Sequence, residues 1–424
     1  MAKVKATHTM CDTAAVALPA NHSLTNAKTA KQDEFYTRYV DIQKEVEAYL
    51  EFDPDTFRDK IVYCNCDDPF ESNFFKYFAV NFNRLGLKKL ITTSYDGSRI
   101  ANVEVPFLEY AGGGNRLQPE AVAVILDRVG AGDGNDVRNI DDVAAFLKRN
   151  KATRKALRSD DVYAGGDFRS ADCVELLKEA DIVVTNPPFS LFRDYVAQIV
   201  AHDKKFLIIG NKNVVTCKNI FPLVKANRLW MGATSMSTDM LFHVPDMIAK
   251  TMLESGKEGS VFHVIDGKVM GRAPAVWFTN IDHGRHHRCP SLLTAADNFR
   301  FSKHKEIRGK MAYERYDNYD AIEVPFSDAI PSDYDGVMGV PISFLNLYNP
   351  EYFEILGMTG LREFDDAFKT RFYTPQECRE RHMEIFGKPG NCSLNSSGVV
   401  NGRPVFKRIL IRHRRNQSNG GHKR

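Results

Sequence analysis

The segment with the clearest capacity for chemistry runs from Asp181 to Phe189 and reads Asp-Ile-Val-Val-Thr-Asn-Pro-Pro-Phe. Its first five residues have the apolar, β-branched character of a buried strand. Pro187 and Pro188 cannot donate ladder hydrogen bonds, so they end that strand. The Asn186 side chain and the Pro187 carbonyl are left at its carboxyl end, with the Phe189 ring beside them.

These groups suit methylation of an amino group. An exocyclic amine that attacks a methyl sulfonium needs its N–H groups held by acceptors, so that its lone pair points at the methyl carbon. The Asn186 amide oxygen and the Pro187 carbonyl are such acceptors, and Phe189 can stack on a planar base. The alternative is a plain strand-terminating turn, because Asn and Pro both favour turns. Placement on the fourth strand of an alternating series favours the catalytic interpretation.

An alternation of short apolar runs and helix-like segments positions that strand end. The pattern predicts a parallel α/β sheet, and such sheets bind ligands at the carboxyl ends of their strands. The expected strands are Lys60–Cys64, Lys89–Thr93, Asp161–Ala164, Asp181–Thr185 and Lys205–Ile209. The expected helices are Ser72–Leu85 and Ser170–Glu179, each opened by a serine suited to N-capping.

Composition narrows the class of protein. The chain has 424 residues and is 43% hydrophobic, which is enough for two or three domains of about 150 residues. Its apolar runs fall short of the roughly 18 residues that a membrane-spanning helix needs. Eight cysteines over this length do not form a disulfide scaffold. We therefore expect a cytoplasmic protein with no membrane association.

The positive charge is concentrated at the C-terminal end. The net charge is +3, yet residues 401–424 hold eight Lys or Arg and no acid, which leaves 3 − 8 = −5 for the rest. This end is either an arm that contacts phosphate or a solubilising disordered tail. After about Arg285 the chain becomes aromatic-rich and irregular, which predicts a second domain.

Several motifs together resemble one known group, the EcoRI-type adenine-specific DNA methyltransferases. The Asn-Pro-Pro-Phe form resembles the adenine-specific branch of the amino-methyltransferases, and the likeness spans roughly residues 31–412. The segments that carry it are Asp33–Thr37, Tyr63–Pro69, Asn186–Phe189, Trp277–Asn280, Tyr316–Ile322 and Tyr334–Pro341. The resemblance implies a Rossmann-like, S-adenosylmethionine-dependent methyltransferase sheet followed by a C-terminal target-recognition region.

The resemblance also implies which residues bind S-adenosyl-L-methionine. Most such enzymes have a glycine-rich turn after the first strand, whereas this chain has none, and Asp67 or Asp68 could accept from the methionine amino group instead. An N-cap role for Asp68 is compatible with that. For Phe35 and Tyr36, packing of a helix onto the sheet is the alternative. The expected cofactor-binding residues are Phe35, Tyr36, Thr37, Asn65, Cys66, Asp67, Asp68, Pro69, Asp96, Asp167 and Phe168.

Two of these assignments have plain structural alternatives. Asp167 and Phe168 would read the cofactor adenine, although Gly165 to Phe168 could be an ordinary turn with a helix cap. Asp96 would accept from a ribose hydroxyl, although Tyr95-Asp96-Gly97 is also a plausible turn.

We expect no metal site. His283, His286, His287 and Cys289 crowd one segment, but their spacing matches no zinc site. A polar loop that faces DNA or solvent is the expected arrangement.

The function that follows is methyl transfer from S-adenosyl-L-methionine to N6 of an adenine flipped out of sequence-specific double-stranded DNA, with Asn186, Pro187, Pro188 and Phe189 as the catalytic group. The alternatives are methylation of RNA adenine or protein glutamine, or an inactive DNA-binding protein. The expected organisation is a disordered leader (1–30), a catalytic domain (31–285), a target-recognition region (286–412) and a basic tail (413–424). The family implies a bacterial or phage-encoded enzyme that needs no obligate protein partner, with any cognate restriction endonuclease acting separately.

Overall fold

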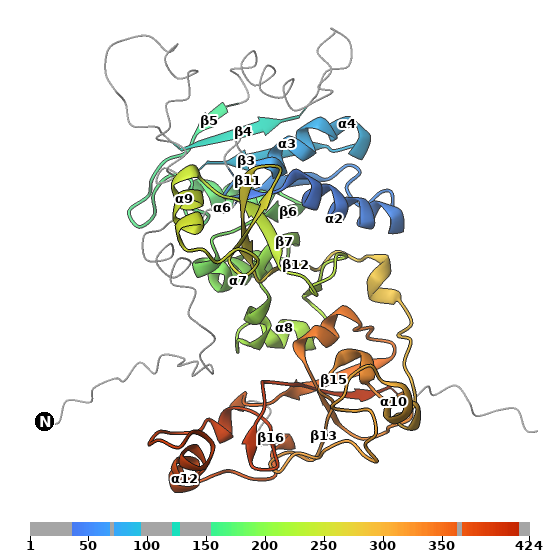
Figure 1. The fold of residues 1–424 in the computed structure, drawn as a ribbon. Coiled ribbons are helices and arrows are strands. Elements are labelled where there is room, and N and C mark those ends of the chain that lie inside the picture. The colour runs from blue at the N-terminus through green and yellow to red at the C-terminus, as the bar shows by residue number, and fades with distance from the viewer. Residues whose placement is uncertain (1–35, 68–71, 95–120, 128–153, 363–366, 415–424) are drawn as a thin grey trace, which may run out of the picture.

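A large mixed sheet forms the centre of the fold. The computed structural model describes residues 36–67, 72–94, 121–127, 154–362 and 367–414. Among them, eight strands pair in the order β5-β4-β3-β2-β6-β7-β12-β8 (Figure 1). They are β2 (Ile61–Cys64), β3 (Lys89–Thr93), β4 (Val122–Leu126), β5 (Arg154–Ala156), β6 (Ile182–Thr185), β7 (Lys205–Asn211), β8 (Trp230–Met231) and β12 (Ala275–Thr279).

The middle of this sheet is parallel and changes its winding direction beside β2. Strand β3 pairs with one side of β2, and β6 and then β7 extend the sheet on the other side, all parallel. The strand order therefore reverses between β2 and β6, and their carboxyl ends flank the crevice in which such sheets bind ligands.

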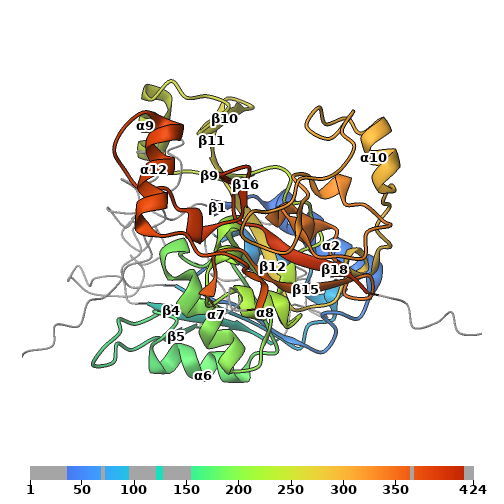
Figure 2. The same ribbon diagram turned by 90° about the horizontal axis from the view of Figure 1, so that it is seen from below.

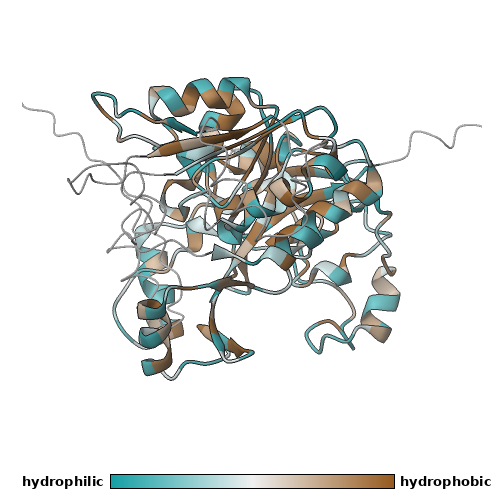
Figure 3. Cartoon of the chain, turned by 90° about the horizontal axis from the view of Figure 1, so that it is seen from above, coloured by the Kyte–Doolittle hydropathy of each residue, from teal (hydrophilic) through white to brown (hydrophobic). Residues whose placement is uncertain are grey.

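Helices cover both faces of the sheet, because successive strand residues point to opposite faces. On one face, Val62, Cys64, Ile182 and Val184 pack against α2 and α3. On the other face, Tyr63 and neighbouring strand residues pack against α6 and α7. Figure 3 shows these apolar strands between helices with hydrophilic outer surfaces. The helices are α2 (Tyr39–Phe52), α3 (Asn73–Val80), α4 (Phe82–Leu85), α6 (Ala171–Glu179), α7 (Phe192–Ala201), α8 (Phe221–Lys225), α9 (Asp246–Glu254), α10 (Ala295–Phe301) and α12 (Pro375–Phe386).

Three smaller sheets complete the described fold. The first has the order β1-β9-β11-β10 and the second, near the C-terminus, the order β13-β14-β18-β15. Their strands are β1 (Tyr36–Thr37), β9 (Met240–His243), β10 (Phe262–Ile265), β11 (Lys268–Ala273), β13 (Ile322–Glu323), β14 (Met338–Val340), β15 (Phe353–Met358) and β18 (Ile409–His413), while β16 (Val399–Val400) pairs with β17 (Arg403–Pro404). Figure 2 shows α9, α12 and the β10–β11 hairpin toward one side and α10 toward the other.

The serine caps predicted from the sequence are confirmed. Ser72 accepts from the backbone N–H groups of Phe74 and Phe75, and Ser170 accepts from that of Cys173. Capping of this kind satisfies N–H groups that have no partner within the first helical turn.

Two features of the predicted sheet are wrong. The sheet is mixed, since β4, β5, β12 and β8 pair antiparallel to their neighbours. The expected strand Asp161–Ala164 is instead an irregular turn, because the Asp160 carboxylate accepts the backbone N–H groups of Val162 and Tyr163 and so bends the chain. The missed strand β4 takes the place next to β3.

No helix within the described ranges is both long and apolar enough to span a bilayer.

Candidate active site

The predicted catalytic and cofactor segments meet at one edge of the sheet. Strands β2 and β6 run parallel in register, with Val62 opposite Ile182 and Tyr63 opposite Val183. The loop that follows β2 and the Asn-Pro-Pro-Phe turn that follows β6 therefore emerge side by side. This edge is the switch point where the winding direction reverses.

A buried aspartate ties these strand ends together. The Asp67 carboxylate accepts from the Ser72 hydroxyl at 2.9 Å and from the Thr185 hydroxyl at 2.6 Å. The Thr92 hydroxyl donates to the Asp67 carbonyl at 2.5 Å. Asp67 is 9% exposed, and such a buried carboxylate must be satisfied by partners of this kind. These bonds hold the loop after β2 against β3 and β6.

Asn65 supports the same loop from within. Its side-chain oxygen accepts from the Cys66 backbone N–H at 2.8 Å and from the Thr93 hydroxyl at 3.0 Å. Its carbonyl shares the single O–H donor of Thr185 with the Asp67 carboxylate. Cys66 has φ of +63°, a left-handed conformation that glycine adopts most easily. The chain thus makes a tight turn here without glycine, because Asn65 holds the Cys66 N–H group.

The Asn-Pro-Pro-Phe turn leads directly into a short 3₁₀-helix. Asn186 is half-buried, Pro187 is buried, and Phe189 begins the short 3₁₀-helix η3 (Phe189–Leu191). Phe189 packs its ring partly against the core on the α2–α3 face. Both prolines lie beyond β6, as predicted, and the turn brings Asn186 and Phe189 to the same strand end.

A close approach between α7 and β7 holds this turn in place. Phe192, the first residue of α7, lies buried against Phe278 with ring centroids 5.3 Å apart. A Cβ atom on Gly210 of β7 would lie 2.3 Å from the Phe192 ring. Glycine is needed at this position because only a backbone without a side chain leaves room for that ring.

The Tyr36–Thr37 segment reaches the same edge from a different sheet. It forms strand β1, which pairs with β9 through Phe242 and His243. The Thr37 carbonyl accepts from the Asn73 side chain at 2.8 Å, so β1 lies against the first turn of α3. Thr37 is 4% exposed, and its hydroxyl has no hydrogen-bond partner among the described residues. A buried hydroxyl without a partner next to a helix N-terminus suits an anionic ligand.

Asp167 and Phe168 are held by protein groups. The Asp167 carboxylate accepts from the Arg169 guanidinium at 2.9 and 2.7 Å. Phe168 is 3% exposed and meets Tyr195 edge to face, with ring centroids 4.9 Å apart. The roles that the family resemblance implies for this pair stay predictions. Phe35, Asp68, Pro69 and Asp96 lie outside the described residues.

Three of the hydroxyls that organise this edge were not predicted from the sequence. They lie at or just before a strand end, and all are buried: Thr92, Thr93 and Thr185. The signal was available, since the runs Lys89–Thr93 and Asp181–Thr185 both end in threonine. A hydroxyl in an otherwise apolar strand needs a polar partner when it is buried.

Cys64 and Cys66, which could have suggested a metal site, do not share a face. Cys64 packs with the α2–α3 core and Cys66 with the α6–α7 core. Burial raises the pKa of the Cys64 thiol well above its ordinary value, which disfavours the thiolate that a metal would need. Within the described part of the chain, no group of three His, Cys, Asp or Glu residues is placed to hold a metal ion.

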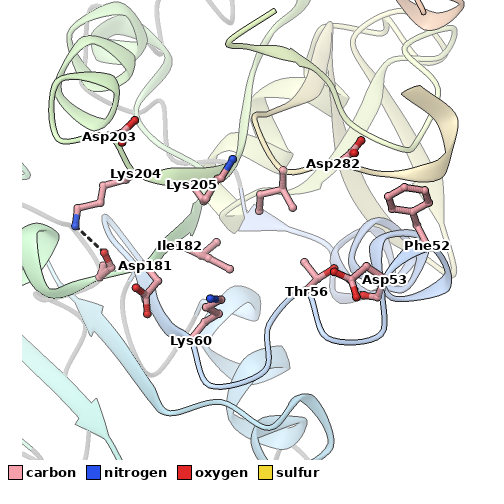
Figure 4. A pocket seen from close by; sticks show the side chains of 12 residues that line it. Phe52, Asp53, Thr56, Lys60, Asp181, Ile182, Asp203, Lys204, Lys205 and Asp282 are labelled. Atoms are coloured by element: carbon pink, nitrogen blue, oxygen red, sulfur yellow. Dashed lines mark hydrogen bonds between the residues drawn. The ribbon is translucent and has the colours of Figure 1, made fainter. Parts of the chain in front are cut away.

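A cavity of about 490 Å³ lies at the opposite, amino edge of the sheet. Figure 4 shows that its charged side chains come from the segments before β2 and β6, from the start of β7 and from the segment after β12, among them Lys60, Asp181, Lys205 and Asp282. Lys204 is engaged, since its ammonium donates to the carbonyls of Lys178 and Ala180. This cavity lies away from the strand ends that carry Asn186 and Asp67.

The histidine-rich segment is only in part the polar loop that we expected. His287 and Cys289 are exposed, but His283 and His286 are only 2% and 7% exposed. The His286 ring stacks on Trp230 with centroids 4.7 Å apart, and His283 meets Tyr49 edge to face. These aromatic contacts make His283 and His286 part of the packed interior. Burial lowers the pKa of His283 to about 4, and it also lowers the pKa of His286.

Comparisons with known proteins identify a family and relatives that match most of the chain. The family described as adenine-specific methyltransferase EcoRI matches residues 23–414. The type II methyltransferase M.EcoRI of Escherichia coli is 39% identical over 341 residues, which cover 79% of this chain and 89% of the relative. M.MpnI of Mycoplasma pneumoniae is 32% identical over 397 residues, which cover 93% and 99%. M.MgeORF184P of Mycoplasma genitalium is 35% identical over 401 residues, which cover 92% and 98%. No solved structure matches.

The fold, the site and these relatives define a class of enzyme. The chain is a site-specific DNA methyltransferase that acts on adenine. Within that class it belongs to the EcoRI family of adenine-specific methyltransferases. The resemblance found in the sequence is thereby confirmed.

Proposed function

We propose that this enzyme transfers a methyl group from S-adenosyl-L-methionine to N6 of an adenine that has been flipped out of double-stranded DNA. The observation that carries the proposal is the meeting of the Asn186 turn and the Asp67 loop at the switch point between β2 and β6. A substrate base and a methyl donor bound at these two loops would be neighbours, which is what direct transfer needs.

The chain's own groups would orient the amine. The Asn186 side-chain oxygen and the Pro187 carbonyl would accept the two N–H groups of the adenine amine, which leaves its lone pair free for attack. Phe189 would stack on the base and hold it in place. An adenine inside a duplex cannot reach these groups, so base flipping is part of the proposal.

The residues at the edge suit the proposed cofactor. The cofactor supplies an electrophilic methyl group on a sulfonium when it is bound. Its carboxylate fits the Thr37 hydroxyl, which has no partner in the described structure and lies beside the N-terminus of α3. Its ammonium fits the Asp67 carboxylate, because a carboxylate is an acceptor of opposite charge and this one lies in the loop that follows β2.

We assign target recognition to residues 286–412, after a Rossmann-like catalytic domain at 31–285. Two cations of the basic C-terminal segment differ in their exposure. Arg408 is buried and bonded to Glu323 at 2.6 Å, whereas Arg403 is exposed. Only the exposed cations of this segment are available to neutralise phosphate.

The test is direct. Purified enzyme is incubated with methyl-labelled S-adenosylmethionine and mixed-sequence duplex DNA, and the DNA is digested to nucleosides. The label is expected only in N6-methyldeoxyadenosine. Parallel incubations replace the DNA with RNA or with protein. Label in RNA or protein but not in DNA contradicts the proposal, and so does label in a cytosine.

A further inference from the structure

Helix α12 presents an unpartnered polar face. Cys378 on its inner side is 6% exposed and packs with Cys392, Leu394 and Val399. The opposite side is exposed and carries Gln376, Arg379, Glu380 and Met383. Their spacing of i, i+3, i+4 and i+7 places all four on one stripe of the helix.

The helix is rigidly built at both ends. Thr374 and Glu377 form a complete capping box, with Pro375 in the first turn, and Gly387 ends the helix in the left-handed conformation. Below the helix, the buried Asn318 side chain bonds to Ser397 and Val399 of the supporting segment. A helix held in this way can present its side chains in a defined register.

The segments on either side of α12 are strongly basic. Residues 367–374 and 387–414 contain eight Lys or Arg and no acid, whereas α12 itself has two Arg and three Glu, a net charge of 2 − 3 = −1. Arg379, Lys388 and Arg403 are exposed and make no ion pair with any described residue. Exposed aromatic rings accompany them, since Phe372 is 61% and Phe406 75% exposed. Cations interleaved with aromatic rings are typical of nucleic-acid surfaces.

This surface is on the side of the molecule that carries the active-site edge. Strand β1 lies against the first turn of α3 at that edge and pairs with β9, and α9 follows β9 directly. Figures 1 and 2 agree that α12 is on the same side as α9, whereas α10 is on the other side. A duplex that delivers a base to Asn186 would therefore pass along α12.

We propose that α12 enters the major groove of the target DNA and that Arg379 reads a guanine there. This inference rests on the proposed function. The major groove admits one α-helix, and an arginine fork donates two hydrogen bonds to guanine O6 and N7. Arg379 has no carboxylate partner among the residues that the structure describes, and it is the cation at the centre of the exposed stripe. Gln376, which donates to Glu380 at 2.8 Å, adds a second base-reading group of the kind that pairs with adenine.

The experiment begins with the target sequence, which is read from the methylated adenines in DNA of a host that expresses the wild-type chain. Purified wild type, Arg379→Ala, Arg379→Lys and Lys60→Ala are then assayed on duplexes in which each base pair of the target is changed in turn. Lys60→Ala is the charge control, because Lys60 is exposed at the amino edge of the sheet. Circular dichroism and cofactor binding check that each variant is folded.

Arg379→Ala is expected to lower kcat/KM on the target by roughly 5- to 150-fold, the usual cost of one bidentate base contact. It should lose discrimination at a single G·C position and keep it elsewhere. Arg379→Lys should not restore discrimination, because an ammonium is a point charge without the fork. Lys60→Ala should stay within about twofold of wild type, since single exposed charges far from a site contribute little.

Three results would overturn the inference. If Arg379→Ala still discriminates between base pairs at every position of the target, Arg379 does not read a base. If Arg379→Lys has the kcat/KM and the base-pair discrimination of wild type, Arg379 contacts a phosphate instead of a base. Unchanged DNA discrimination together with a loss of self-association on sedimentation would assign the face to a second copy of the chain. A wild type that methylates no DNA is a different result, because it contradicts the proposed function itself.

Discussion

The two edges of the central sheet carry similar polar residues in opposite arrangements. At the carboxyl edge, Asn65, Asp67 and Thr185 are buried and bonded to one another. At the amino edge, exposed aspartates and lysines line a cavity of about 490 Å³, and the Asp181 carboxylate there accepts the Ile61 backbone N–H at 2.8 Å. The site that we propose does not lie at this charged cavity. We assign it to the reversal of winding between β2 and β6, because sheets of this kind bind ligands at the carboxyl ends of the strands beside such a reversal.

The largest expected effect is a difference in kcat between variants at the two ends of β6. Asn186→Ala should lower kcat by about 10²- to 10³-fold, because it removes an acceptor for the amine whose charge develops during transfer. Cofactor binding, measured by titration, should stay close to wild type. Asp181→Ala, at the amino end of the same strand, is the control and should leave kcat unchanged. A similar loss of activity in both variants would mean that the strand as a whole is sensitive, and the assignment of Asn186 would be wrong.

Acid should lower the free energy of unfolding through His283, which lies near the amino edge of the sheet. It follows Ile281 and Asp282, which line the cavity there. Burial lowers the pKa of His283 from 6.5 to about 4. Because the unfolded chain binds the proton first, the stability from the neutral ring is complete above pH 6.5 and is lost as the pH falls toward 4, by about 3 kcal/mol. Buried His286, whose pKa is also lowered, acts in the same direction.

Urea unfolding at pH 7.5, 6 and 5 measures this loss. His283→Gln should flatten the dependence, because its amide can still donate to the Met231 carbonyl, which the His283 Nε2 contacts at 2.9 Å, but does not titrate. An equally steep dependence in that variant would assign the acid sensitivity to other groups.

Gly210→Ala tests the packing behind the catalytic turn. The added Cβ would meet the Phe192 ring, and overpacking of this kind costs about 1–3 kcal/mol. Turnover should also fall, since Phe192 follows Phe189 by three residues and both would shift. Thermal unfolding and steady-state methylation report the two effects. The double variant Gly210→Ala with Phe192→Leu should recover part of the stability and part of the turnover. If it recovers neither, the losses do not come from a clash with the Phe192 ring.

The smallest effect is expected from Thr185→Val, which keeps the shape but removes the hydroxyl that bonds to Asp67 and to the Asn65 carbonyl. Because Asp67 keeps its bond from Ser72, the loss of stability should be roughly 1 to 2 kcal/mol. The affinity for S-adenosylmethionine, measured by calorimetry, should fall as the Asp67 loop loosens. Thr185→Ser should restore it, and equal affinity in all three proteins would exclude a role for this bond in the cofactor loop.

Local patterns were enough to predict the strands that lead into the site and the helix caps. Four of the five expected strands are present, because β-branched runs bounded by turn residues are read from neighbours in sequence. Asp161–Ala164 failed because the Asp160 side chain competed for the backbone. Strand β4 was missed although Val122–Leu126 is a continuous apolar run.

The histidine segment shows the limit of such local patterns. Nothing near His283 and His286 in the sequence specifies that Tyr49 and Trp230 pack against them. Burial of a polar ring depends on partners distant in sequence, so a solvent-facing loop and a packed interior give the same local pattern.

By itself, the sequence determined the chemistry available to this enzyme: the acceptors of Asn186 and Pro187, the Phe189 ring, and the family to which the chain belongs. The tertiary structure alone decided which groups act together. Strand pairing brought the Asp67 carboxylate within 2.6 Å of the Thr185 hydroxyl, although Thr185 lies 118 residues further along the chain. Both residues therefore lie at the carboxyl edge of the sheet and not at the charged amino edge. The physical reason is that residue types and short spacings are local properties, whereas a site depends on register and winding direction across strands far apart in sequence.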